Sequence, residues 1–590
     1  MSTVNTKLIR YIPLVMYVIF FSIIIYYFFN YFEYVFFYQE KSKLFLTTFF
    51  DFKTYLDRPG GLLEYVSDFI TSLYYYPRLG ALIVAGEIIL IVLFSSLTAK
   101  RYSGRQCYFI PFFIGGVFFF MHLNHYFLNV NTLGVMLQLA LFYSVMNFSS
   151  KKTGYIIAIL FPLWYYVTGV FSGIFMILFI FDNLIKKEKG YLFRIITIAG
   201  VWAIFFFIGS NLLFYKGTSE LLYGPFTYVN CGGQEVLFVY TVLLLILLPA
   251  ISMSLPKSIT GFLDKKELAL KLAPVIVFGL VIFFSGQRVN RGNIDYFEVE
   301  KLFYEGKYAE LVKYNYDHQV LNRLSLFLNN IALSQTGQLL NRMFYFPQDK
   351  NGGTLFLRWG DDNEIRKRGG YFYYFIGMVN EAHRWAFELM VVKGYMPEQI
   401  KMIARTEIIN GHYNSARKYV DMLKNTLFYK DTGKKYEKYL NNEKLINSDP
   451  ELGRIRRLLP RHDFFVNPEQ PIIDLDMILK YEKNINVRAL EYQVAYLLIR
   501  RKVGAVVSEL PLFERAGYKK LPVYVAEAVA PFKFLNIGKW PELKYLKISD
   551  DVRKRFYEFN KIQNSKKPNK QQLLFNKFGF TYWYYVFYRK

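Results

Sequence analysis

The acidic residues that follow the first apolar segment are the side chains in this sequence best placed to do chemistry. Asp51 and Asp57 lie in a long connection before the second apolar segment, and Glu64 and Asp68 follow them. A carboxylate held at a membrane surface can activate an acceptor hydroxyl as a base, or it can hold a divalent cation. We therefore assign Asp51 and Asp57 to catalysis and prefer Asp51. The alternative is that Asp51 only caps or solvates a helix at the membrane interface.

Two histidines stand three residues apart at the end of the third apolar segment. At this spacing on a helix, the imidazoles of His122 and His125 can face one phosphate or one metal ion. The sequence offers no third ligand nearby, so we assign no metal site. We expect both histidines to bind substrate in a polar cleft with Asp51, and Lys53 and Tyr55 are assigned to the same role. Alternatively, the histidines only meet lipid headgroups.

The connection that carries Asp51 has the composition of two helices. Aromatic residues crowd the stretch 49–56, which suits a helix lying in the membrane interface. The run Pro59-Gly-Gly then breaks the chain, and helical spacing of apolar residues resumes from Leu62 to Leu73. The carboxylates of this connection are thereby held close to the membrane surface.

Composition divides the chain into two domains. Hydrophobic residues make up 53% of the chain, and long apolar runs stop near Phe284. A membrane span needs about 20 apolar residues. We predict nine spans, at about 11–36, 77–98, 107–123, 131–149, 153–168, 170–185, 192–214, 235–255 and 270–286. The predicted fold is therefore all-α, with a multi-pass helix bundle at residues 1–286 and a separate helical domain at residues 287–590.

Basic residues fall at every second connection between the predicted spans. The clusters are Lys7/Arg10, Lys100/Arg101/Arg105, Lys151/Lys152, Lys186/Lys187/Lys189/Arg194 and Lys257/Lys265/Lys266/Lys271. Short cytoplasmic loops retain Lys and Arg, so the N-terminus is expected in the cytoplasm. The alternate connections, around 39–76, 123–131, 168–170 and 214–235, then face outward. An odd number of spans also places residues 287–590 outside, which is the periplasm if the chain lies in a bacterial inner membrane.

A glycine-centred pattern recurs in residues 287–590. Gly306, Gly337, Gly377 and Gly411 are 31, 40 and 34 residues apart, and a large side chain follows each of them two residues later. These distances bracket the 34-residue tetratricopeptide period. The domain resembles tetratricopeptide repeats, which implies stacked helical hairpins with a concave surface for a protein partner.

The order of elements in the first half resembles the C-superfamily of membrane glycosyltransferases. In both, a first span is followed by a long outer loop with an interfacial helix and an acidic residue, and then by short paired spans. The resemblance implies a sugar donor linked to a polyisoprenoid phosphate, and a divalent cation is compatible with such an enzyme. The paired acidic motif of many members is not evident in this chain.

Four motifs spread over the chain carry a further likeness. They are Pro59-Gly-Gly-Leu-Leu-Glu-Tyr-Val-Ser-Asp-Phe, Tyr74-Tyr-Tyr-Pro-Arg-Leu-Gly-Ala-Leu-Ile, Asn330-Ile-Ala-Leu-Ser-Gln-Thr-Gly-Gln-Leu and Asn410-Gly-His-Tyr-Asn-Ser-Ala-Arg-Lys-Tyr. Together they resemble an uncharacterised family found in Bacteroidota, domain-of-unknown-function family 6057. This likeness supports the architecture and implies no particular reaction or cofactor.

Two functions of different classes fit these observations. The first is an enzyme that transfers sugar from a polyisoprenoid-phosphate donor to an envelope acceptor at the outer face. The alternative is a non-catalytic scaffold, anchored by its spans, whose repeats hold envelope proteins. Nine spans exceed what an anchor requires, which favours the enzyme. The net charge of +26 comes without an aromatic-basic motif for nucleic acid, so we expect lipid, lipid-linked sugar or protein as partners.

Overall fold

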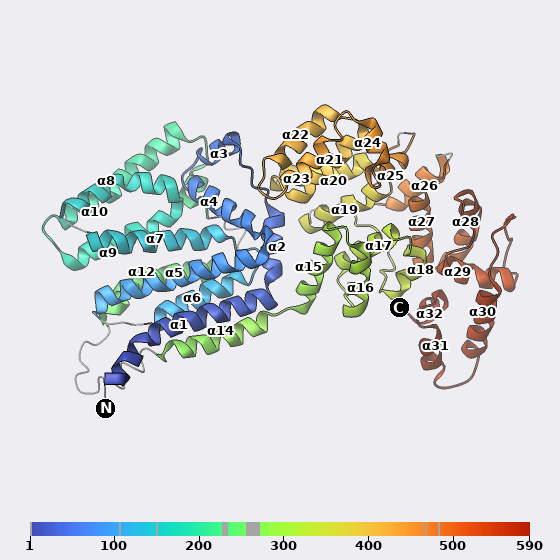
Figure 1. Ribbon diagram of the computed structural model, residues 1–590, viewed down its shortest axis with the longest axis horizontal. Coiled ribbons are helices and arrows are strands. Elements are labelled where there is room, and N and C mark those ends of the chain that lie inside the picture. The colour runs from blue at the N-terminus through green and yellow to red at the C-terminus, as the bar shows by residue number, and fades with distance from the viewer. Residues whose placement is uncertain are drawn as a thin grey trace. The chain divides into compact units, whose positions relative to one another are not determined.

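The computed structural model describes residues 3–104, 108–148, 151–226, 234–254, 272–360, 362–462, 464–467, 469–481 and 484–589. These residues form helices, turns and loops without a strand, which confirms the predicted all-α class (Figure 1). The chain divides into two compact units. They are Met1–Asn290 with Asn425–Phe428, and Arg291–Lys424 with Tyr429–Lys590.

The first unit is a bundle of long apolar helices with shorter helices in its connections (Figure 1). The described helices are α1 (Thr3–Asn30), α2 (Glu33–Ser42), α3 (Phe49–Tyr55), α4 (Gly61–Ser72), α5 (Pro77–Ser103), α6 (Phe109–His122), α7 (Asn129–Phe148), α8 (Lys151–Thr168), α9 (Ser172–Lys186), α10 (Tyr191–Ile208), α11 (Thr218–Tyr223), α12 (Glu235–Ser254) and α14 (Pro274–Arg288). The predicted interfacial helix and its successor correspond to α3 and α4.

Six helical segments of the described residues are long and apolar enough to cross a membrane. They are Tyr11–Asn30, Pro77–Ser103, Asn129–Asn147, Gly154–Lys186, Tyr191–Leu213 and Glu235–Ser254. Each of the nine predicted spans falls on a helix, but α6 and α14 are shorter, and Gly154–Lys186 contains two predicted spans joined by the tight turn Gly169–Phe171. Several apolar helices therefore suit a membrane, and the number nine stays a prediction.

The predicted first span, 11–36, is interrupted in the structure. Helix α1 ends at Asn30 and α2 begins at Glu33. The Asn30 side chain donates a hydrogen bond to the Tyr26 carbonyl oxygen (2.7 Å). A side chain that bonds a nearby carbonyl competes with the helical ladder, and this contact accompanies the end of α1.

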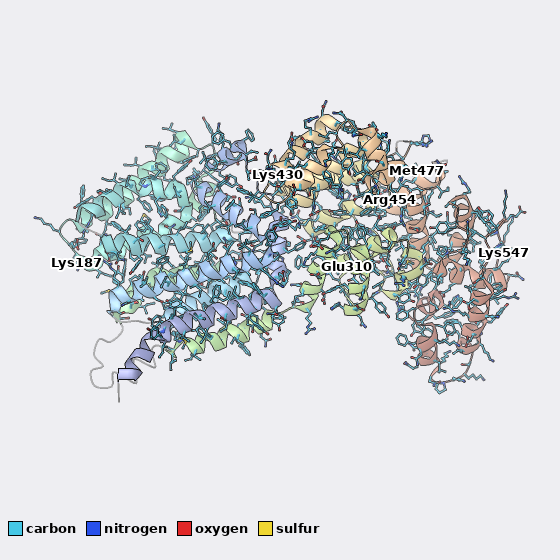
Figure 2. The ribbon with its side chains drawn as sticks, in the orientation of Figure 1. Lys187, Glu310, Lys430, Arg454, Met477 and Lys547 are labelled. Carbon is cyan, nitrogen blue, oxygen red and sulfur yellow. The ribbon has the colours of Figure 1, made fainter. Side chains whose placement is uncertain are left out.

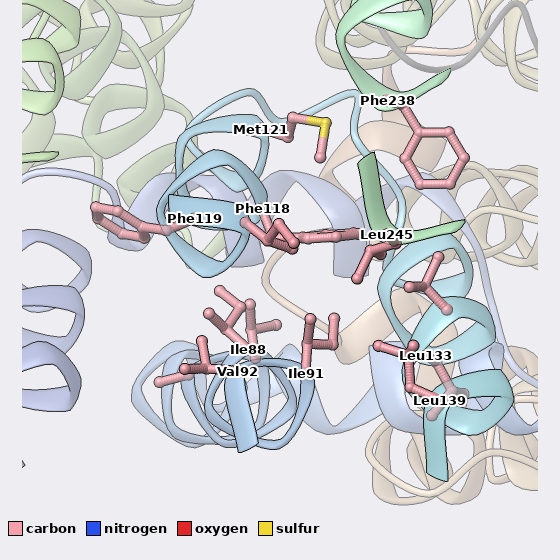
Figure 3. Close-up of a cluster of buried hydrophobic side chains, with 14 of the residues drawn as sticks. Ile88, Ile91, Val92, Phe118, Phe119, Met121, Leu133, Leu139, Phe238 and Leu245 are labelled. Carbon is pink, nitrogen blue, oxygen red and sulfur yellow. The ribbon is translucent and has the colours of Figure 1, made fainter. Parts of the chain in front are cut away.

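Helix α5 lies at the centre of the first unit, in contact with α1, α6, α7 and α12. Figure 3 shows Ile88, Ile91 and Val92 of α5 facing Phe118 of α6 and Leu245 of α12, all of them buried. A Cβ on Gly115 of α6 would lie 2.3 Å from the Val92 side chain, so this glycine permits the close approach of two helices. By contrast, α10 exposes large apolar side chains such as Ile196 and Phe207. Such an outward apolar face suits contact with lipid.

Hydrogen bonds join the connections of one end of the bundle. The Gln39 side chain donates to the Phe127 carbonyl oxygen (2.9 Å), which links α2 to the loop after α6. Backbone bonds then link the loop before α4 to the end of α8 (Gly60 N to Tyr166 O, 2.8 Å). They also link the turn that follows α8 to the loop after α11 (Val170 N to Gly224 O, 2.9 Å). All four connections predicted to face outward therefore gather at one end.

Three of the basic connections, those that follow α5, α7 and α9, gather at the other end, whereas Arg105 and the predicted cluster Lys257/Lys265/Lys266/Lys271 lie outside the described residues. Arg101 donates to the Asn147 side chain (2.9 Å), and Tyr155 donates to the Gly190 carbonyl oxygen (3.4 Å). Lys187, in the loop between α9 and α10, lies at the tip of the bundle in Figure 2. Among the described residues, the connections alternate between the two ends, in line with the positions of Lys and Arg in them. Which end faces the cytoplasm stays a prediction.

The second unit consists of short helices that mostly pack against the next helix in the chain. They are α15 (Arg291–Tyr304), α16 (Tyr308–His318), α17 (Arg323–Gln335), α18 (Leu339–Arg342), α19 (Asn363–Phe375), α20 (Val379–Lys393), α21 (Pro397–Asn410), α22 (Tyr413–Lys424), α23 (Lys430–Glu437), α24 (Glu443–Ser448), α25 (Leu452–Arg457), α26 (Pro471–Tyr481), α27 (Val487–Ile499), α28 (Val503–Arg515), α29 (Val523–Phe534), α30 (Asp550–Gln563), α31 (Lys570–Phe578) and α32 (Tyr582–Tyr588).

The four glycines of the predicted repeats occupy the same kind of turn. Gly306, Gly337, Gly377 and Gly411 have φ between 69° and 87°, and each separates two consecutive helices. The amide of the residue after each glycine bonds a carbonyl five residues back, as His412 N does to Glu407 O (3.0 Å). This is a Schellman ending, in which the left-handed residue is usually glycine. The turns are confirmed, whereas the tetratricopeptide resemblance stays a prediction.

Glu527 of α29 should make the second unit less stable as the pH rises from 4.5 to about 7. The residue is 1% exposed and accepts a hydrogen bond from the Tyr582 amide (2.7 Å). Burial raises its pKa to about 7, although the Tyr582 amide and Arg555 oppose the rise. Between pH 4.5 and 7 the folded state therefore holds a proton that the unfolded state has lost, so stability falls with rising pH.

Between pH 4.5 and 7 the free energy of unfolding of the second unit falls by a total on the order of 3 kcal/mol. We expect Glu527→Gln to remove this part of the pH dependence, since glutamine stays neutral at every pH. Hydrogen exchange of α29 amides in the full chain, compared at pH 5 and pH 8, measures the effect. If the opening free energy changes equally between pH 5 and pH 8 in the wild type and in Glu527→Gln, Glu527 does not titrate in this range.

Candidate functional site

The segment predicted to carry the catalytic residue forms α3, whose first turn is closed by its own side chains. Thr48 accepts a hydrogen bond from the Asp51 amide (3.1 Å), and the Thr48 hydroxyl donates to the Asp51 carboxylate. Thr48 is therefore the N-cap of α3, and Asp51 supports this cap from the first turn of the helix. Whether Asp51 also takes part in catalysis stays a prediction. Phe49 and Phe50 are 69% and 78% exposed, so α3 presents an aromatic face outside the packed core.

Asp57, the second predicted catalytic residue, belongs to an open cluster of alternating charges. Its carboxylate lies 3.7 Å from the Arg58 guanidinium and 3.5 Å from the Lys216 ammonium, and its side chain is 46% exposed. Glu220 of α11 completes the cluster, 3.8 Å from Arg58 and 3.6 Å from Lys216. Two cations thus stand beside an accessible carboxylate. Arg58 can bind a phosphate through two hydrogen bonds, and Lys216 can bind it as a point charge.

The main chain that carries this cluster packs closely against its neighbours. The connections involved are the α3–α4 turn, the α8–α9 turn and the loop after α11. Gly60 has φ of 81°, and a Cβ there would lie 2.4 Å from the Pro225 ring. A Cβ on Gly169, with φ of 58°, would lie 2.1 Å from the Gly224 carbonyl oxygen. The Tyr166 hydroxyl also donates to the Leu56 carbonyl oxygen (2.9 Å). The α3–α4 turn that carries Asp57 and the loop that carries Lys216 are therefore fixed relative to each other.

A second, less exposed group of charges supports the same turn from α4. Lys43 lies 2.6 Å from Asp68 and 3.2 Å from Glu64, and Arg58 donates to Glu64 at 2.7 Å. Burial alone would raise the pKa of Glu64, but Lys43 and Arg58 outweigh it and lower the pKa. Burial raises the pKa of Asp68, which Lys43 opposes and Glu64 reinforces. Arg58 thus links the group on α4 to the open cluster.

Tyr55 and Lys53, both predicted to bind substrate, have different surroundings. The Tyr55 hydroxyl donates to Asp68 (2.8 Å), and burial with the nearby Asp68 carboxylate raises the pKa of Tyr55. Tyr55 therefore stays protonated and is a hydrogen-bond donor within the α4 group. Lys53 is exposed, with its ammonium 4.9 Å above the Phe49 ring. Neither side chain is shown to contact Asp51 in the described part of the chain.

The two predicted substrate-binding histidines have separate partners. His122 is 1% exposed, and its Nε2 lies 2.7 Å from the Thr132 hydroxyl. His125 is half-buried and packs its ring against Tyr38, with a centroid distance of 4.4 Å. The structure therefore places one imidazole in the core and the other beside α2, and a shared role in substrate binding stays a prediction.

Arg58, Lys216 and Glu220 were missed by sequence reasoning. Lys216 and Glu220 have helical i, i+4 spacing, which is the only local signal, and their partner Asp57 is far away in the chain. Among the residues that the structure describes, no group of three or more His, Cys, Asp or Glu could hold a metal ion. This result does not test the divalent cation that the glycosyltransferase resemblance allows, and no step below depends on such a cation.

Comparison with known proteins gives one result that covers nearly the whole chain. Residues 7–589 match the model of a family described as a family of unknown function, DUF6057. No curated protein and no solved structure matches the chain. Both units lie within the matched range, and the resemblance expected from the four sequence motifs is confirmed at the level of the family. The chain therefore belongs to the family of unknown function DUF6057.

Proposed function

We propose that this chain is a membrane enzyme that transfers a sugar from a polyisoprenoid-phosphate donor to an envelope acceptor. Its place would be the inner membrane of Bacteroidota, with the Asp57 cluster at the outer face. The proposal is supported chiefly by one observation, the exposed Asp57 carboxylate between the cations of Arg58 and Lys216. A donor of this class has a charged head and an apolar tail, and α3 beside the cluster exposes Phe49 and Phe50.

In the proposed reaction Arg58 and Lys216 pair with the donor phosphate, which releases Asp57 from both cations. Asp57 then accepts the proton of the acceptor hydroxyl. The acceptor oxygen forms a bond to the anomeric carbon of the sugar, and the bond between that carbon and the phosphate oxygen breaks. The polyisoprenoid phosphate leaves with its negative charge held by the two cations. Asp51 has a positioning role here, because it closes the first turn of α3 through Thr48.

The substitution Asp57→Asn is expected to reduce sugar transfer by about 100-fold or more, the usual contribution of a general base. The substitution Asp51→Asn should reduce transfer less, because the side-chain oxygen of asparagine can still accept the hydrogen bond from the Thr48 hydroxyl. Transfer is measured with the full chain in lipid vesicles that contain a radiolabelled polyisoprenoid-phosphate sugar. Asp431→Asn is the matched control, since this carboxylate is 95% exposed in the second unit.

The pair of variants also identifies the base. If Asp51→Asn abolishes transfer and Asp57→Asn does not, Asp51 is the catalytic carboxylate and the cluster is structural. If the surface glycans of a deletion strain equal those of its parent and vesicles show no transfer, the enzyme is rejected. The non-catalytic scaffold, with the repeats as a platform for envelope proteins, would then remain.

A further inference from the structure

The second unit contains a cavity of about 280 Å³ that the proposed transfer reaction does not use. It is lined by the turn between α15 and α16, by α19, α21 and α23, and by Glu451 at the start of α25. The volume is near the lower limit of roughly 300 Å³ for small-molecule sites. The cavity therefore suits a ligand about the size of a single ring.

Aromatic rings form one part of the cavity wall. Tyr304, Tyr308, Tyr371 and Tyr436 line it together with Phe375. The Tyr308 ring meets the Phe375 ring edge to face at a centroid distance of 6.1 Å, which restricts both rings. Burial, reinforced by Glu451, raises the pKa of Tyr308 to about 12. Its hydroxyl thus stays protonated at neutral pH and can donate a hydrogen bond.

Charged side chains also line the cavity, in equal numbers of each sign. The cations are Lys401, Arg405 and Lys435, and the carboxylates are Glu305, Glu398 and Glu451. Arg405 lies 2.9 Å from Glu451, and Lys401 lies 2.6 Å from Glu398. The cavity therefore offers donors and acceptors together.

We infer that this cavity binds one ring of an uncharged carbohydrate. A sugar ring has an apolar face of C–H groups, which can lie on the tyrosine rings, and a rim of hydroxyls that both donate and accept hydrogen bonds. Hydroxyls can accept from Arg405 and Lys435 and donate to Glu451. An anionic ligand would meet three carboxylates and a cationic ligand would meet three cations, so the balanced charges favour a neutral ligand. This inference does not rest on the proposed transfer reaction.

The test is ligand-observed NMR with saturation transfer from the full chain in lipid nanodiscs, which avoids detergents with sugar headgroups. The probes are glucose, mannose and N-acetylglucosamine, with glucuronic acid and glucosamine as charged counterparts. We expect at least one neutral probe to bind and the charged probes to bind more weakly. Tyr308→Leu should weaken this binding at least tenfold, and Lys435→Ala at least threefold. Tyr316→Leu, on the same helix and half exposed, should change it less than twofold.

Three results would overturn the inference. They are the absence of binding by every neutral probe, preference for a charged probe, and equal binding by the wild type, Tyr308→Leu and Lys435→Ala. The thermal midpoint of each variant reports whether it is folded. If Tyr308→Leu fails to fold, Lys435→Ala decides, because Lys435 is exposed and its loss leaves the packed core unchanged.

Discussion

Replacing Arg368 with methionine is expected to destabilise the second unit by about 3 to 5 kcal/mol, because it removes one partner of a buried ion pair. Arg368 of α19 is fully buried. Its guanidinium lies 2.5 Å from Glu300 of α15 and 2.8 Å from Glu364 in the first turn of its own helix. Burial alone would raise the pKa of Glu364, but Arg368 and Lys367 outweigh it and lower the pKa to about 2.

The cost arises mainly at Glu300, whose side chain is 5% exposed and would be left without its cation. We therefore expect Arg368→Met combined with Glu300→Gln to regain part of the lost stability. Hydrogen exchange of amides in α15 and α19 measures the opening free energy in the full chain. Lys434→Met is the control, since Lys434 pairs with an exposed Asp431 and should show no measurable change. A loss below about 1 kcal/mol for Arg368→Met would contradict the assigned role.

The substitution Gly377→Ala should cost about 3 kcal/mol, from two causes that can be separated. The residue has φ of 87°, and a left-handed conformation costs an L-residue about 1 to 2 kcal/mol. A Cβ there would also lie 2.4 Å from the Leu458 carbonyl oxygen, and such overpacking typically adds about 1 to 3 kcal/mol. The main chain at Leu458 must shift to relieve this contact.

Two other glycines separate these causes. Gly411 has φ of 78° with open space where a Cβ would stand, so Gly411→Ala should show the backbone cost alone. Gly504 has open space and lies in α28 outside the left-handed region, so Gly504→Ala should be neutral or stabilising by up to about 1 kcal/mol. The thermal midpoints of the three full-chain variants rank them by stability. Equal losses for Gly377→Ala and Gly411→Ala would show that the Leu458 contact carries no cost.

The local features of this fold could be predicted from the sequence. Aromatic spacing and the break at Gly60 predicted α3 and α4, which span Phe49–Tyr55 and Gly61–Ser72. Glycine recurrence predicted four helix-to-helix turns. The same kind of turn before α28 was missed, because Arg501 takes the left-handed conformation there with φ of 58°. A pattern of recurring glycines cannot predict a turn in which a residue other than glycine takes the left-handed conformation.

The candidate site was only partly predictable, because its contacts join distant parts of the chain. Asp57 was selected together with Asp51 as an acid of this connection. Its cations come from its neighbour Arg58 and from Lys216 after η3 (Gly209–Leu213). The cavity of the second unit is likewise lined by residues that lie far apart in the sequence, from α15 to α23. Periodicity reports which face of a helix is buried. It carries no information on which two buried or charged faces meet.

The run of left-handed turns in the second unit also bears on how fast that unit folds. Most of its helices contact the helix just before or after them, so their native contacts lie close together in the sequence. Little chain entropy must be lost before each such contact forms, and domains rich in local contacts fold in microseconds to milliseconds. The unit can therefore add one helical hairpin at a time as the chain leaves the ribosome. A partly synthesised chain would expose an apolar helix face, and not the unpaired backbone groups of a strand edge.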